Sequence, residues 1–217
     1  MYQLIGKAIL AIAFFSSVTP ILAQNDLGVG LVSVNFNVET ILHFYERPGA
    51  ANTARTVRFF NDESISSLSI RDLESVEKWL KPESLWLDYS SFVFRCRSKR
   101  AGWFEVIVNN DSGQTYWVRE SKFLEFQTWN QFLKGMFSIA RSSSYPQKIL
   151  RRPESRSLEI KYRGRDCFDV KSMRGDWVEI RAAAQCDDAE GAGPLFRSGW
   201  IRWKRGNRLL VDYFITS

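Results

Sequence analysis

Several stretches of the chain alternate apolar and polar residues with the period of a β-strand. Residues 31–38 (LVSVNFNV) alternate over eight positions, and residues 104–108 (FEVIV) and 178–182 (VEIRA) alternate over shorter spans. This period places successive side chains on opposite faces of a pleated strand. Residues 116–118 and 209–213 add the aromatic and β-branched bias of strands. The pattern predicts a mainly β protein.

Two segments have helical spacing instead. In residues 67–80, Leu73, Val76 and Leu80 fall on one helical face, and a proline follows at position 82. Residues 128–140 (TWNQFLKGMFSIA) are a second, shorter helical candidate. We interpret this second segment as a link between domains.

The chain contains an internal repeat. Two hairpin-like segments align without a gap, and each has an arginine followed three residues later by a tryptophan. Flanking blocks also match, in the same order in both halves, which indicates two copies of one small fold. The matching blocks are YERP (45–48) with LRRP (150–153), FRCRSKRAGWFEV (94–106) with FDVKSMRGDWVEI (168–180), and YWVR (116–119) with GWIR (199–202).

The two copies differ mainly in their connections. The first copy carries an extra stretch at about residues 62–91, and the second carries a longer loop at residues 182–198. Connections that differ in length between matching blocks are typical of loop insertions. We therefore predict an N-terminal domain over residues 24–141 that includes this insertion, which is helical in our interpretation, and a C-terminal domain over residues 146–217.

The repeated blocks resemble bacterial Src-homology-3-like (SH3b) domains. The resemblance lies in a Trp followed by Val or Ile, a turn with Gly, and a second Trp beside Val or Ile, as in residues 103–118 and in 177–180 with 199–201. It implies two small, partly open five-stranded β-barrels in tandem, with the two Trp-bearing strands side by side. It also implies binding of cell-wall peptides, glycans or protein partners as a class. The family's opening signature survives only in residues 44–50 and 149–155, so no ligand residue is carried over.

The first residues have the order of a secretory signal peptide. Lys7 precedes an apolar run over residues 8–15, which polar residues and Pro20 interrupt. We predict cleavage after Ala23, so that residues 1–23 form the signal peptide. The apolar part is shorter than the roughly 20 residues of a membrane span, which favours cleavage over an uncleaved anchor. The protein is therefore expected to be periplasmic or secreted, without stable membrane insertion.

The charge of the chain gives little support for a nucleic-acid partner. The formal net charge is +6, but basic residues alternate with Asp and Glu along the whole sequence. A single-sign basic tract, which marks many nucleic-acid-binding arms, is missing. We therefore expect no nucleic-acid binding.

Three cysteines allow at most one intramolecular disulfide. Cys167 and Cys186 flank the second hairpin, and a chain reversal between them would bring them opposite each other. We predict a disulfide between them, with two buried free thiols as the alternative. Cys96 aligns with Val170 in the repeat, which predicts a small core residue.

Residue patterns for catalysis or cofactor binding were sought and not found. The single histidine, His43, and three scattered cysteines do not provide the four ligands of a structural zinc site. The sequence contains no Gly-rich phosphate loop and no nucleophile elbow. We expect no catalytic residues, no metal and no cofactor.

Eight tryptophans are a large number for a chain of this length. Four of them recur at matching positions of the repeat, and we interpret these four as core residues. They are Trp103, Trp117, Trp177 and Trp200.

Three unmatched tryptophans are candidates for an exposed binding face. Trp203 is surrounded by basic residues that include Arg202 and Arg205, and such a cluster could stack sugars or hold an acidic partner. The alternative is a solvated basic hairpin. The candidate ligand-binding residues are therefore Trp79, Trp86, Trp203, Arg202 and Arg205.

These observations favour an exported, non-catalytic binding module that recognises a cell-envelope component, either a wall peptide or glycan polymer or a protein partner. One alternative is an exported hydrolase with a carboxylate pair in the insertion, at residues 62–88. That alternative requires buried and mutually close carboxylates. The other alternative is a structural subunit of an envelope assembly, which requires an exposed apolar patch around Trp79, Trp86 and Leu87.

Overall fold

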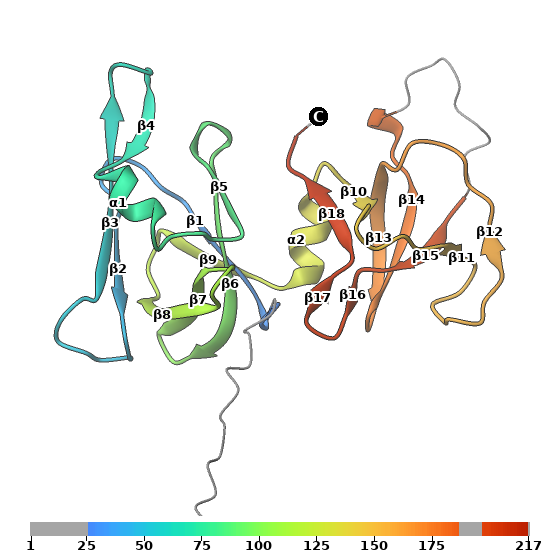
Figure 1. Cartoon of the computed structure of the whole chain (residues 1–217), viewed down its shortest axis with the longest axis horizontal. Coiled ribbons are helices and arrows are strands. Elements are labelled where there is room, and N and C mark those ends of the chain that lie inside the picture. Colours follow the sequence, from blue (N-terminus) through green and yellow to red (C-terminus); the bar gives the residue numbers. More distant parts are fainter. Residues whose placement is uncertain (1–25, 187–196, 217) are drawn as a thin grey trace, which may run out of the picture.

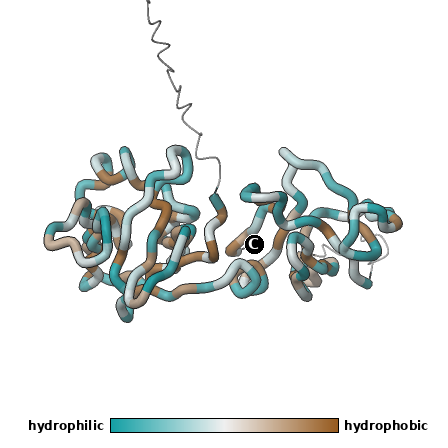
Figure 2. The backbone as a smooth tube through the Cα atoms, turned by 90° about the horizontal axis from the view of Figure 1, so that it is seen from below, coloured by the Kyte–Doolittle hydropathy of each residue, from teal (hydrophilic) through white to brown (hydrophobic). Residues whose placement is uncertain are grey.

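The computed structural model describes residues 26–186 and 197–216, and it shows two curled antiparallel half-barrel sheets side by side (Figure 1). The predicted signal peptide, residues 1–23, lies outside the described residues. Seen from below, hydrophobic and hydrophilic segments are interspersed along both lobes (Figure 2). The prediction of a mainly β protein is confirmed.

The first sheet has nine strands in the order β4-β3-β2-β8-β7-β6-β1-β9, with β5 paired to β6. A short helix, α1 (Leu73–Glu77), and a 3-10 turn, η1 (Leu87–Tyr89), lie on either side of β5 in the sequence. The strands are β1 (Gly30–Val34), β2 (Ile41–Tyr45), β3 (Arg55–Asp62), β4 (Ser67–Ile70), β5 (Ser84–Trp86), β6 (Ser91–Arg100), β7 (Trp103–Asn109), β8 (Gln114–Arg119) and β9 (Leu124–Gln127).

The second sheet has seven strands in the order β12-β11-β15-β14-β13-β10-β18, and a small hairpin of β16 and β17 stands beside it. Helix α2 (Trp129–Gly135) precedes this sheet, and a 3-10 turn, η2 (Ala184–Cys186), follows β14. The strands are β10 (Ser138–Arg141), β11 (Ile149–Leu150), β12 (Glu159–Ile160), β13 (Phe168–Arg174), β14 (Trp177–Ala182), β15 (Gly199–Arg202), β16 (Lys204–Arg205), β17 (Arg208–Leu209) and β18 (Val211–Phe214).

The strand register of the two sheets follows the sequence repeat. Arg100 lies opposite Trp103 in the β6–β7 hairpin, as Arg174 lies opposite Trp177 in the β13–β14 hairpin. Both hairpins have a register shift at the same place, at the residue directly before the serine that pairs with the next strand's glutamate. On the next strand, Trp117 and Trp200 again occupy equivalent positions. The two copies therefore share their pairing in detail.

The structural repeat is longer than the sequence blocks. Strand β1 lies between β6 and β9 as β10 lies between β13 and β18, so six strands occur in the same order in both halves. The second copy thus begins with β10, which pairs with both β13 and β18. Strand β10 lies inside the residue range 24–141 predicted for the first domain, and the linking segment is α2.

The helical predictions hold only in part. Ser67–Ile70 is a strand, because these residues form a hairpin with β3 in which Ile70 is buried opposite Phe59. Only Leu73–Glu77 is helical, and Asp72 at its start has a left-handed backbone. The second predicted helix ends at Gly135, and the residues that follow enter β10. In both segments, strand pairing prevails over helical spacing.

Helix α2 begins at a capping box. The Thr128 side chain accepts a hydrogen bond from the Gln131 backbone N–H, and the Gln131 side chain accepts one from the Thr128 backbone. The pair satisfies two N–H groups that have no partner within the helix. The helix is thereby fixed at the junction of the two sheets.

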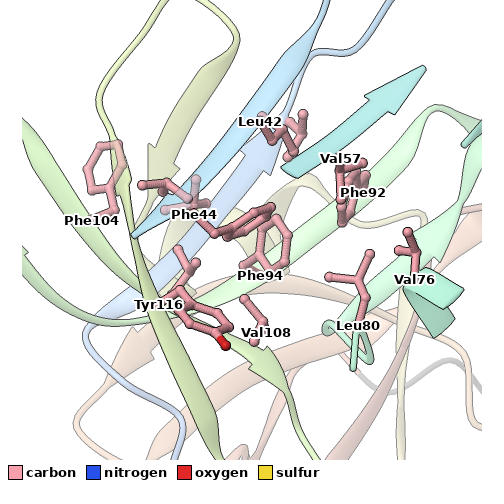
Figure 3. Packing of buried hydrophobic residues seen from close by; sticks show 14 of the residues in the cluster. Leu42, Phe44, Val57, Val76, Leu80, Phe92, Phe94, Phe104, Val108 and Tyr116 are labelled. Carbon is pink, nitrogen blue, oxygen red and sulfur yellow. The ribbon is translucent and has the colours of Figure 1, made fainter. Parts of the chain in front are cut away.

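Two hydrophobic cores fill the sheets. The first is rich in aromatic side chains, with Phe44 against Phe94 and Tyr116, and α1 contributes Val76 (Figure 3). The second lies under β13–β15 and includes Phe168, Ile180 and Ile201.

The second core also contains residues of the first half. Leu27, Leu31 and Val93 pack in the same cluster as the buried side chains of the second sheet. Helix α2 lies between the two halves in Figure 1, and the Trp129 indole N–H donates to the Leu27 carbonyl oxygen, 2.8 Å away. The halves therefore share part of one core.

Cys96 is a buried free thiol in the first core, as the alignment with Val170 predicts. Its sulfur donates a hydrogen bond to the Ser98 carbonyl oxygen. Burial raises the pKa of the Cys96 thiol from 9.0 to about 12. The folded protein therefore keeps this proton in a pH range in which the unfolded chain releases it.

The raised pKa predicts a loss of stability at alkaline pH. Between pH 9 and pH 12 the unfolded chain ionises at Cys96 and the folded chain does not, so the free energy of unfolding falls as the pH rises. Replacement by the residue of the second copy, Cys96→Val, should remove this contribution. Urea unfolding of both proteins at pH 7.5 and pH 10.5 measures it. An equal loss in the variant and the wild type would contradict the prediction.

The predicted disulfide between Cys167 and Cys186 is confirmed. It joins the residue before β13 to the 3-10 turn after β14 and so closes the base of that hairpin. Structural disulfides are typical of oxidising compartments such as the periplasm or the cell exterior. Within the described residues, no helix is long and apolar enough to cross a membrane.

Candidate functional site: an aromatic and cationic groove

The recurring tryptophans lie on the outer face of each sheet. On β14, Val178 and Ile180 point into the core, so the alternation of the strand turns Trp177 to the opposite face. Trp103, Trp177 and Trp200 are half-buried and belong to neither core, and only Trp117 is buried. The interpretation as core residues is therefore wrong for Trp103, Trp177 and Trp200, whereas Trp117 is buried as expected.

The three tryptophans predicted as ligand contacts have different environments. Trp203 is only 5% exposed and packs against Trp129, so it is a core residue and not an exposed ligand contact. Its backbone and indole N–H groups donate to the carbonyl oxygens of residues 176 and 175. Trp79 is half-buried and packs against Phe44 in the first core. Only Trp86, 62% exposed, presents its ring to solvent.

A groove of about 440 Å³ lies on the outer face of the second sheet. Two of the predicted residues, Arg202 and Arg205, line it together with Trp177. Its described lining contains three cationic side chains and no acidic one. The lining residues are Ser144, Tyr145, Pro146, Gln147, Lys148, Leu150, Ser155, Trp177, Arg202, Arg205 and Leu210.

Gln147 fixes the wall of the groove. Its side-chain amide donates to the carbonyl oxygens of Arg202 and Leu210, at 2.9 and 3.0 Å, and its side-chain oxygen accepts from the Arg202 backbone N–H. The Gln147 carbonyl oxygen in turn accepts from Arg141, which forms two hydrogen bonds with Asp166. This hydrogen-bonded pairing raises the pKa of Arg141. The loop between β10 and β11 is therefore held in place before any ligand arrives.

Two arginines stack on aromatic rings at this groove. The Arg202 guanidinium lies 4.3 Å from the ring centre of Trp177, and the Arg208 guanidinium lies 5.0 Å from that of Tyr145. Arg202 also donates to the Ser155 hydroxyl and lies 3.7 Å from the Asp176 carboxylate. A cation over a ring face is attracted by the ring, which restricts where each guanidinium lies.

The first repeat has an equivalent face with a different connection beside it. Arg119 occupies the position of Arg202, and Arg100 stacks 5.1 Å from the ring centre of Trp117. However, β8 connects to β9 through residues 120–123, whereas the β16–β17 hairpin with Arg205 and Arg208 stands between β15 and β18. The hairpin supplies the additional cationic side chains in the second repeat.

The same polar cluster lies on the outer face of each sheet. Ser98 donates to Glu105 at 2.7 Å, and Ser172 donates to Glu179 at 2.8 Å. A basic residue from the register shift accompanies each glutamate, with Arg97 at 3.9 Å and Lys171 at 3.6 Å. In the second repeat, the Ser172 hydrogen bond and Lys171 help to lower the pKa of Glu179. The cluster links neighbouring strands in each copy.

The carboxylates of the 62–88 insertion do not form the arrangement that a hydrolase requires. Most of them are exposed, and Asp62 is half-buried. The buried one, Glu83, has a side chain that is 6% exposed and pairs with Arg95, which is 10% exposed. The Tyr213 hydroxyl donates to Glu83 at 2.9 Å across the two halves. Glu83 therefore joins a structural ion-pair network, in which burial and the nearby carboxylate raise the pKa of Tyr213.

An apolar surface lies beside this network. Trp86 and Tyr89 from the first half meet Phe214 and Ile215 from the second half around a pocket of about 400 Å³. Leu87, which was expected in such a patch, is half-buried against the first core. The patch is therefore centred on Trp86 and Tyr89.

No family model, curated protein or solved structure matches this chain.

Sequence reasoning missed Trp177 and Gln147 as groove residues. The alternation of residues 178–182 already places Trp177 on the face opposite Val178 and Ile180. Gln147 carries no such signal, because its role depends on hydrogen bonds to strands more than 50 residues away in the sequence.

Proposed function

We propose that this protein is an exported, non-catalytic binding module that recognises a cell-envelope component through the groove on its second repeat. The observation that carries the proposal is the groove itself, with Trp177, Arg202 and Arg205 on a wall that Gln147 holds in place. A pre-formed site with aromatic and cationic side chains suits recognition of a partner chain at little cost in ordering.

We further propose that each half is an SH3-like barrel. The support is the pairing of the two Trp-bearing strands in each half, β7 with β8 and β14 with β15, within a curled sheet. The predicted signal peptide and the disulfide support export.

Co-sedimentation with purified cell wall tests the envelope-binding function. The mature protein should pellet with the wall at low salt, and Trp177→Ala should reduce the retained fraction at least tenfold. Trp103→Ala changes the equivalent residue of the first repeat and should retain wild-type binding. Circular dichroism of both variants checks that they remain folded.

Two results would contradict the proposal in different ways. Wild-type protein that stays in the supernatant would exclude wall binding and leave a protein partner as the target. Equal loss in both variants would show that the groove is not the binding site.

The second candidate function is a structural subunit of an envelope assembly. The specific observation in its favour is the exposed pair of Trp86 and Tyr89, with ring centres 5.8 Å apart, beside Phe214. Exposed apolar patches of this kind often mark protein interaction sites.

A further inference from the structure

We propose that the groove of the second repeat is a carboxylate clamp, which takes the free carboxylate of a peptide together with an adjoining apolar side chain. This inference rests on the proposed binding function and names the ligand class of that same site. The observations that support it are the arginines that lie over aromatic rings and the apolar residues that line the groove.

The aromatic rings of the groove each hold an arginine side chain. Stacking of a sugar or a base requires an open ring face, but Arg202 covers a face of Trp177 and Arg208 covers a face of Tyr145. The rings therefore orient arginines. The planar N–H fork of a guanidinium matches the two oxygens of a carboxylate, and a ring beneath the guanidinium restricts its position.

The charged side chains that line the described groove are all cationic. Lys148, Arg202 and Arg205 line the groove, and Arg208 lies opposite Arg205 in the β16–β17 hairpin. Acidic groups stand at the rim: Asp176 lies 3.7 Å from Arg202, and Glu159 pairs with Lys148. Arg205 and Arg208 are exposed and carry no ion pair among those found in the described residues. The described side chains of the site retain a net positive charge that an incoming anion can neutralise.

Apolar side chains also line the groove. Pro146 is exposed next to the cationic side chains, and Leu150 and Leu210, 8% and 6% exposed, form the apolar base of the groove. A phosphate or sulfate polymer would leave this surface without a partner, whereas a peptide that carries a carboxylate and an apolar side chain would cover it. The combination therefore favours a peptide carboxylate.

The test uses two fluorescently labelled peptides of identical sequence, Gly-Ala-Leu, one with a free C-terminal carboxylate and one with a C-terminal amide. Fluorescence anisotropy with the full mature protein should show binding of the acid at least tenfold tighter than binding of the amide. The double variant R202Q/R208Q should weaken binding of the acid at least tenfold. The variant R202K keeps the charge but loses the planar fork, and it should also weaken binding.

The matched control is R100Q/R119Q, which removes two charges from the equivalent face of the first repeat. It should bind the acid as the wild type does. Equal affinity for acid and amide, or equal loss in both double variants, would overturn the clamp. Tighter binding of a polygalacturonate oligosaccharide than of the acid would overturn the peptide class.

The result of the peptide-binding test can be distinguished from the result of the wall-binding test. Wall binding that depends on Trp177 but shows no preference for the acid peptide would overturn the clamp and leave the binding module standing. Binding of the acid peptide without wall binding would support the clamp and direct the search to a protein partner.

Discussion

Replacing Glu83 by alanine is expected to destabilise the protein by about 3–5 kcal/mol. The variant leaves the Arg95 guanidinium, with a side chain only 10% exposed, without its ion-pair partner in the protein interior. It also removes the acceptor of the Tyr213 hydroxyl. Urea unfolding followed by circular dichroism measures the change.

Two control variants separate the buried charge from its neighbours. Tyr213→Phe removes only a hydrogen bond and should cost about 1 kcal/mol. Asp111→Ala removes the partner of Lys81 in an ion pair whose side chains are 52% and 70% exposed, and it should cost at most about 1 kcal/mol. A loss in the Glu83 variant no larger than that in the Asp111 variant would show that Arg95 finds another partner.

Removing the disulfide should destabilise the protein by about 3 kcal/mol. The bond joins Cys167 and Cys186, which are 19 residues apart, and it restricts the unfolded chain by closing a loop of that size. The double variant Cys167→Ser/Cys186→Ser should therefore have a lower urea midpoint than the wild type. The same measurement on the wild type with a reducing agent should give a similar shift.

Cys96→Val is the control for the disulfide experiment, since it removes the third cysteine and leaves the bond intact. The reducing agent should lower its urea midpoint as much as it lowers that of the wild type. A double serine variant as stable as the wild type would show that strand pairing alone holds the base of the β13–β14 hairpin.

Much of the strand arrangement could be predicted from the sequence because the repeat fixes it. The equivalence of Trp103 with Trp177, and of Trp117 with Trp200, gives the register of three neighbouring strands in each half. The disulfide was predictable for the same reason, since the hairpin brings its two flanks together. Repeated local patterns carry this information because pairing within a hairpin depends on nearby residues.

The features that the sequence did not predict depend on contacts between residues that are far apart in the sequence. Ser67–Ile70 has helical spacing in the sequence, but β3 is available to pair with it. Trp203 lies in a basic segment that suggests exposure, yet α2 places Trp129 against its ring. The groove itself requires two loops, strands β11, β14 and β15, and the β16–β17 hairpin to come together, and no short motif encodes that arrangement.

The shared core has a consequence for how the two copies can be inherited. Leu27, Leu31 and Val93 complete the apolar cluster of the second repeat, and Tyr213 completes the polar network around Glu83 in the first. Neither copy can be recombined into another protein without exposing surface that the other now covers. The two repeats are therefore expected to be inherited together, because each covers surface that the other would otherwise expose.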